Sequence, residues 1–244
     1  MIFDIVNLNN VPNDTYLFGG KAVTLSKLSN SGLNVPSGFV LSSNIYRQYV
    51  NGKLNHYDFQ REVYEWLDKI GVKQECIVRS SANVENTVGR DCPGVFESCV
   101  CYDKKDILDV IIKVWDSTNS ISAQSFFNKE DNPSDLSMAV IVQRIKKGEY
   151  TAVIQSYDFV EDRRRIIVEY CEGSINSIVD DEKDAFIYYI EYSNNSEMPY
   201  SNDIPVDIIK KDCIKIESIV GGRAEIEAQI LDNEIWYIQA RNIS

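Results

Sequence analysis

The chain has 244 residues, 44% of them hydrophobic, so it can bury a core as one large domain or as two lobes. Charged residues make up 25%, which excludes intrinsic disorder, and the net charge of -12 disfavours nucleic acid and membrane surfaces as partners. No apolar run could span a bilayer, and the first ten residues have no basic region ahead of an apolar one, so we expect no secretory signal. The six cysteines form no CxxC pair. These features indicate a cytoplasmic protein with reduced thiols.

The first half of the chain alternates helical and strand patterns. Gly19-Gly20 form a turn before a helix, and Ser31-Gly32 end that helix. The elements that follow are a strand over 39–41, helical residues over 44–70 with a break near Asn51, strands that begin at Cys76 and Val95, and helical residues over 104–128.

From Ser137 onward, strands dominate the chain. Five segments read as successive strands: MAVIVQRI, TAVIQSYDFV, RRIIVEYC, SINSIVD and AFIYYIEY. A helix ended by Gly221-Gly222 follows, and the chain closes with a hairpin around Asp232-Asn233. The pattern predicts an α+β protein of two lobes: an α/β lobe over 1–132 and a mostly antiparallel lobe over 133–244.

Two segments of the first lobe could bind phosphate. Lys21 follows two glycines at the start of a helix, where backbone N–H groups and a positive charge favour an anion. The segment is not a Walker A loop, because Ala22 replaces the Ser or Thr that would reach Mg²⁺. Arg79 ends an apolar strand and could offer its fork to phosphate oxygens. An ordinary turn with a solvated lysine and a surface arginine are the alternative interpretations.

The final hairpin carries four polar groups among apolar residues. Glu225 and Glu227 share one strand face, and Gln239 and Arg241 share a face of the next strand. Two carboxylates suit Mg²⁺, and the amide and guanidinium could complete that site. Alternatively, the glutamates form a solvated face, or Gln239 and Arg241 only pair with them across the hairpin.

These motifs in this order resemble the nucleotide-binding domain of the pyruvate phosphate dikinase and phosphoenolpyruvate synthase family, which has an ATP-grasp-like fold. The resemblance covers nearly the whole chain. It rests on five segments: GGKAVTLSKLSNSGLNVPSGFVLSS, IVRSSANVEN, PGVFESCVCY, MAVIVQRI and EIEAQILDNEIWYIQARNI.

The resemblance implies a nucleotide cleft between the two lobes, with ATP and Mg²⁺ as cofactors. Lys21, Arg79 and Arg241 would be catalytic, and Glu225 and Glu227 would hold the metal, with Glu225 in place of the commoner Asp. The residues implied in nucleotide binding are Lys21, Arg79, Gly94, Ser98, Gln143, Glu227, Gln239 and Arg241. Among them, Ser98 stands where the family usually has Thr.

Some family features differ or are missing. Asn176 stands where the family has a glutamate, and Ala152 replaces a glycine of its S-G-V-x-F-T strand. The phosphohistidine motif G-G-x-T-x-H is not found, and His56, the only histidine, is expected to be an ordinary surface residue.

The resemblance implies an ATP-dependent phosphotransferase that acts on a small acceptor or on a histidine of a separate protein. Two alternatives are a nucleotide-binding subunit without turnover and an ATP-grasp ligase that activates a carboxylate. The acceptor itself cannot be read from the sequence.

Overall fold

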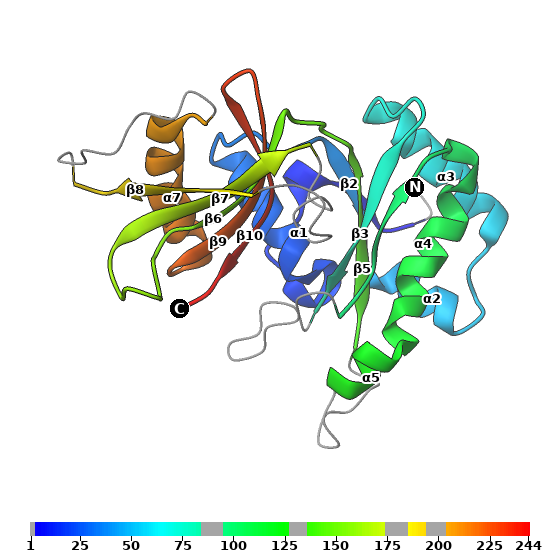
Figure 1. Cartoon of the computed structure of the whole chain (residues 1–244). Helices are drawn as coiled ribbons and strands as arrows, with labels where there is room; N and C mark the ends of the chain where they lie inside the picture. Colours follow the sequence, from blue (N-terminus) through cyan, green and yellow to red (C-terminus); the bar gives the residue numbers. More distant parts are fainter. Residues whose placement is uncertain (1–2, 84–94, 127–135, 174–184, 194–203) are drawn as a thin grey trace. The chain divides into compact units, whose positions relative to one another are not determined.

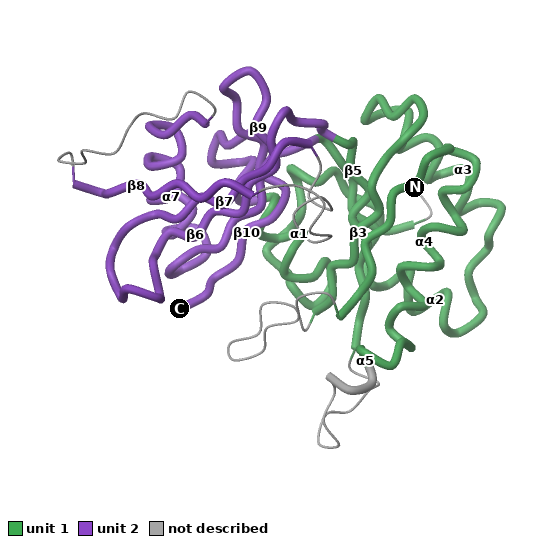
Figure 2. Tube along the Cα trace, in the orientation of Figure 1, with its two compact units in different colours: residues 1–26, 37–145 green, residues 27–36, 146–244 purple. Residues whose placement is uncertain are grey.

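A computed structural model of the protein describes residues 3–83, 95–126, 136–173, 185–193 and 204–244, without the side chains of 124–126. The chain divides into two compact units (Figure 2). Unit 1 comprises residues 1–26 and 37–145, and unit 2 comprises residues 27–36 and 146–244. No helix within the described ranges is long and apolar enough to cross a membrane.

Unit 1 is built on a five-stranded sheet with the order β1-β2-β5-β3-β4, in which every pair of neighbours is antiparallel (Figure 1). Its strands are β1 (Ile5–Asn7), β2 (Gly38–Leu41), β3 (Cys76–Ala82), β4 (Ser98–Cys101) and β5 (Met138–Arg144). Its α-helices are α1 (Thr15–Asn30), whose end lies in unit 2, α2 (Ser43–Val50), α3 (His56–Lys69), α4 (Ile107–Asp116) and α5 (Ile121–Phe126). Short 3-10 helices cover Leu8–Asn10, Lys104–Asp106 and Ser117–Asn119.

The two faces of this sheet differ in character. One face packs against helices α2 to α4 in a single apolar core, to which Phe39, Val78 and Val142 contribute from the sheet and Trp115 from α4. Because side chains alternate along a strand, the neighbours of these residues point to the opposite face. That face carries three of the polar residues that the sequence marks as functional: Arg79, Ser98 and Gln143.

Unit 2 contains a second antiparallel sheet, with the order β10-β9-β6-β7-β8, together with helix α7 (Figure 1). Its elements are β6 (Tyr150–Gln155), β7 (Arg165–Glu172), β8 (Phe186–Glu191), α7 (Val206–Val220), β9 (Ala224–Leu231) and β10 (Glu234–Asn242). Helix α7 buries Ile209, Cys213 and Ile216, and Asp212 on the same helix accepts a 2.7 Å hydrogen bond from the buried Tyr237 of β10.

Two predicted chain reversals of unit 2 are confirmed. Helix α7 ends at Gly221, which has the left-handed φ of 80° that a glycine adopts at low cost. Asp232 and Asn233 connect β9 to β10 with φ values of 51° and 61°. Positive φ at both central residues is the mark of the tight hairpin turn that suits twisted strands.

The boundary between the units differs from the expected one. β5, which the sequence suggested as the first strand of the second lobe, pairs with β2 and β3 in unit 1. The units therefore divide after Ile145 rather than at 132, and residues 27–36 belong with unit 2. The predicted strand SINSIVD lies for the most part outside the described residues.

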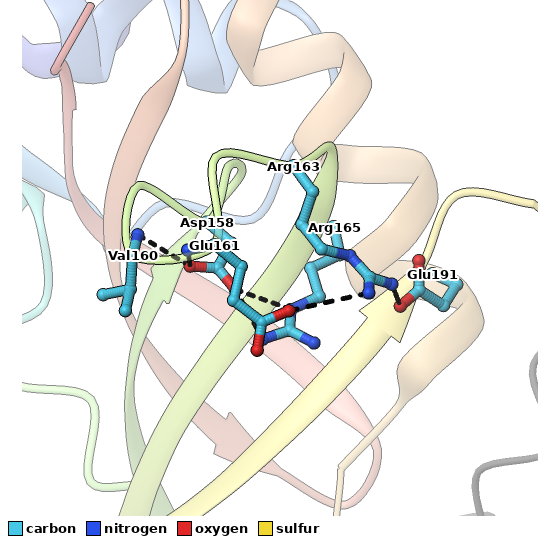
Figure 3. A network of polar contacts seen from close by, with 6 residues as sticks. All are labelled: Asp158, Val160, Glu161, Arg163, Arg165 and Glu191. Carbon is cyan, nitrogen blue, oxygen red and sulfur yellow. Dashed lines mark hydrogen bonds and ion pairs between the residues drawn. The ribbon is translucent and has the colours of Figure 1, made fainter.

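The β6–β7 connection is held by one buried carboxylate (Figure 3). Asp158, only 1% exposed, accepts hydrogen bonds from the backbone N–H groups of Val160 and Glu161. The guanidinium of Arg165 donates to it through Nε at 2.7 Å, while Arg163 pairs with Glu191 closer to solvent. The hydrogen bonds from Glu161 and Arg165 keep the pKa of the Asp158 carboxyl below its ordinary value.

We predict that Asp158→Asn lowers Tm at neutral pH by roughly 5 °C or more, because the carboxylate accepts from two backbone N–H groups and contacts both Nε and Nη2 of Arg165. Since the folded pKa is depressed, the stabilisation is present above the unfolded pKa of about 3.9 and is lost as pH falls through the folded value. Thermal melts should therefore converge for wild type and variant in acid. Asp162→Asn, in the exposed part of the same loop, is the control; an equal loss there would contradict the assignment.

Candidate functional site

Helix α1 is interrupted at Gly19, where the backbone has φ 74° and ψ 160°. In a regular helix the N–H of Ala22 would donate to the carbonyl of Phe18. Here it donates to the hydroxyl of Ser81 on β3 at 3.0 Å, and this hydroxyl donates to the Phe18 carbonyl at 2.8 Å. A side chain of the sheet thus replaces one helical hydrogen bond and separates Lys21 from the first turn of α1.

Only glycine fits at position 19. A Cβ there would lie 2.1 Å from the carbonyl oxygen of Ser81, and the positive φ is unfavourable for any other residue. The glycine pair that the sequence marks as a turn is therefore a contact point between α1 and β3. It brings the Gly-Gly-Lys segment and the Val-Arg-Ser-Ser segment together.

Arg79 lies on the same face of β3 as Ser81, since the two residues are two positions apart. Its partner on β4 is Ser98, and Gln143 of β5 lies on the same face, opposite Gly38. Arg79 is 7% exposed and Gln143 is 1% exposed, whereas Ser98 is exposed. Three of the residues implied by the resemblance thus share one face of one sheet, and its charged member is a guanidinium that stays ionised when buried.

The final hairpin collects its four polar groups on one face of the second sheet. Glu225 pairs with Arg241, and Glu227 pairs with Gln239, with a register shift between Tyr237 and Gln239. Both Nε and Nη2 of Arg241 contact Oε1 of Glu225, at 2.8 and 2.7 Å. The expected grouping is confirmed, and so is the cross-strand pairing for Glu225 and Arg241.

The register shift is what makes this grouping possible. If pairing continued unchanged from the turn, Gln239 would lie opposite Ile226 and Arg241 opposite Ala224, both on the buried apolar face. The extra residue, Ile238, forms a β-bulge that moves Gln239 and Arg241 onto the glutamate face. It also leaves Tyr237 in the core, where its hydroxyl reaches α7.

Sequence reasoning did not identify the neighbours of these glutamates. Gln155 of β6 lies opposite Glu225, Val153 lies opposite Glu227, and Glu169 of β7 lies opposite Val153. Alternation along β6 places Gln155 and Val153 on one face, but only the strand pairing shows which residues they adjoin. Gln155 therefore extends the polar face by one strand.

The two glutamates fit a magnesium ion that also binds phosphate. Mg²⁺ takes six oxygen ligands and usually keeps waters and substrate phosphates beside one or two carboxylates. Arg241 contacts Glu225 through Oε1, and Oε2 of the same carboxylate would be the atom that takes a metal. No group of three or more metal-ligating side chains occurs among the described residues, and phosphate oxygens would have to complete the shell.

Three residues named in the sequence analysis are not part of the geometry described above, two of them because the structure does not describe them. Gly94 and Asn176 lie outside the described residues. His56 is exposed at the first position of α3, as expected for a surface residue.

A family model described as pyruvate phosphate dikinase, AMP/ATP-binding domain, matches residues 56–195, which is more than half of the chain. The chain belongs to this family. The matched range includes Arg79 and Gln143, and it precedes the final hairpin. The family assignment therefore agrees with the resemblance drawn from the motifs.

Two further comparisons show what the chain is similar to in sequence and in fold. A protein of Bacillus subtilis named "Uncharacterized phosphotransferase YvkC" is 24% identical over 93% of this chain, which spans 33% of that protein. The crystal structure of D-alanine–D-alanine ligase from Helicobacter pylori superposes with a TM-score of 0.51 at 13% identity, over 94% of this chain and 54% of the ligase. The fold is therefore α+β and ATP-grasp-like, as expected.

We predict that Gly19→Ala destabilises the protein far more than Gly32→Ala. Both glycines have positive φ, at 74° and 83°, so both substitutions carry the left-handed penalty of about 1–2 kcal/mol. A Cβ meets nothing within 4 Å at Gly32, whereas at Gly19 it meets the Ser81 backbone. Chemical denaturation of both variants measures the difference, and equal losses would show that the Gly19–Ser81 contact is unimportant.

Proposed function

We propose that this chain binds Mg-ATP and serves as an ATP-dependent phosphotransferase. The observation that carries the proposal is the hairpin face on which Glu225 and Glu227 oppose Arg241 and Gln239. It offers carboxylates for a cation beside a guanidinium and an amide for phosphate oxygens. Membership of an AMP/ATP-binding domain family supports nucleotide as the ligand.

In this proposal, Lys21 and Arg79 bind the phosphate oxygens of ATP. Lys21 lies just after the interruption of α1, in the first turn of the helical segment that follows Gly19. The positive end of a helix dipole favours an anion, and the lysine adds a full charge. Ser98, opposite Arg79, can donate a hydroxyl hydrogen bond, and Gln143 would recognise the adenine.

Phosphoryl transfer needs positioned positive charge rather than covalent help from the protein. The P–O bond to the leaving phosphate oxygen breaks and a bond to the acceptor forms, while negative charge spreads over the transferred group. Lys21, Arg79 and Arg241 would stabilise this charge, and Mg²⁺ held by Glu225 and Glu227 would neutralise the phosphates when bound. A basic local site is needed because the chain as a whole carries a net charge of -12.

The acceptor is proposed only by class. The Bacillus subtilis relative carries the name phosphotransferase, which supports transfer to an acceptor rather than simple hydrolysis. A small molecule or a histidine on a separate protein would each provide the attacking atom. Nucleotide binding without turnover and carboxylate activation by a ligase are the other outcomes to test.

We predict that Glu227→Gln removes the Mg²⁺-dependent part of ATP affinity, raising Kd by about tenfold or more, because it neutralises one of two metal ligands. Calorimetric titration with ATP, with and without Mg²⁺, measures the change. Glu234→Gln is the matched control: it is an exposed glutamate of the same hairpin, at the turn. Unchanged affinity in Glu227→Gln, or an equal loss in the control, would reject the metal assignment.

A phosphorus NMR time course with Mg-ATP and a pool of small acids and amino acids tests turnover. ADP with a new phosphorus signal would support a kinase, and AMP with orthophosphate would support dikinase-type chemistry. ADP and orthophosphate, formed only with an acid and an amine together, would instead indicate a ligase. Unchanged ATP despite measured binding would contradict turnover by this chain alone.

A further inference from the structure

The hydroxyl of Ser81 occupies an unusual position within the hydrogen bonding of α1. It accepts from the N–H of Ala22 and donates to the carbonyl of Phe18, two groups that an unbroken helix would join directly. Insertion of a side chain into the helical ladder is a recognised cause of a kink. Here the kink falls at Gly19, whose non-helical φ and ψ let the chain pass around the inserted hydroxyl.

This insertion creates a second helix start inside α1. The segment after Gly19 begins with Gly20 and Lys21, and the N–H of the next residue, Ala22, donates to Ser81 instead of to the preceding turn. Without the inserted hydroxyl, Ala22 could donate to Phe18 and the helix could close. The hydroxyl is therefore the group that keeps the segment around Lys21 open.

Ser81 is well suited to fix this segment, because it is 0% exposed and lies on a central strand. β3 is paired on both sides, with β5 and β4, so the Ser81 backbone has little freedom. Arg79 lies two residues earlier on the same face. One strand thus carries Arg79 and holds the segment of α1 that carries Lys21.

We infer that Ser81 is a positioning residue for nucleotide phosphate: its hydroxyl sets the Gly19–Lys21 segment in register with Arg79. This inference rests on the proposed function, because it requires Lys21 to bind phosphate. Ser81 itself need not touch the nucleotide. Its substitution should then weaken ATP binding only through the placement of Lys21.

The test is a double-mutant cycle in the full chain, with Kd for Mg-ATP measured by calorimetry at fixed ionic strength. Ser81→Ala should raise Kd by up to about tenfold, the effect expected of lost hydrogen bonds. In a Lys21→Ala background the same change should alter Kd by less than about twofold, because the group it positions is already absent. Ser80→Ala is the matched control, since Ser80 is also buried but points to the opposite face of β3.

Each outcome decides the inference. If the unsubstituted chain shows no measurable Mg-ATP binding, the proposed function fails and the inference fails with it. If it binds but Lys21→Ala leaves Kd unchanged, the inference alone fails, because Lys21 then binds no phosphate. If Lys21→Ala weakens binding but Ser81→Ala does not, or weakens it equally in both backgrounds, Ser81 has no positioning role and the proposed function stands. Should Ser81→Ala not yield folded protein, the cycle is repeated with Ser81→Cys, which keeps the shape but donates weakly.

Discussion

Both sheets are antiparallel throughout the described chain, and in such a sheet the register determines which side chains share a face. The positions of the candidate binding residues depend on this register and on one local irregularity in each unit. In unit 2 the bulge at Ile238 moves Gln239 and Arg241 to the glutamate face. In unit 1 the hydroxyl of Ser81 interrupts α1 and opens the segment that carries Lys21. Each irregularity lies beside well-paired strands, and the free energy of their pairing offsets the local strain.

The bulge in the final hairpin also explains how two largely apolar strands can carry four polar groups on one face. The hairpin is apolar because Ile226, Ala228 and Tyr237 form the core under α7. Its other face is polar and only partly exposed, with Glu225 and Arg241 at 22% and 19% side-chain exposure. Partial burial of an ion pair carries a desolvation cost that offsets its attraction, so this pair is weak evidence for a role in stability.

Much of this arrangement could be predicted from the sequence, because it depends on local signals. The glycines at 32 and 221, the Asp-Asn turn and the i, i+2 spacing of the glutamates all have local physical meanings that the structure bears out. What the sequence could not supply is pairing between distant segments. β5 resembles the strands that follow it, yet it pairs with β2 and β3, and neither the bulge at Ile238 nor the contact of Ser81 with α1 leaves a mark in the local pattern. The proposed roles of these residues came from the resemblance to a known family, which rests on several motifs in the same order and not on any single motif.

The most direct test of Mg-ATP binding is a crystal structure of the chain with Mg²⁺ and a non-hydrolysable ATP analogue. Our account predicts phosphate oxygens within about 3 Å of the Lys21 ammonium and the Arg79 guanidinium. It also predicts a metal about 2.1 Å from a carboxylate oxygen of Glu227. A nucleotide bound away from these side chains, or a metal held without either hairpin glutamate, would contradict the assignment.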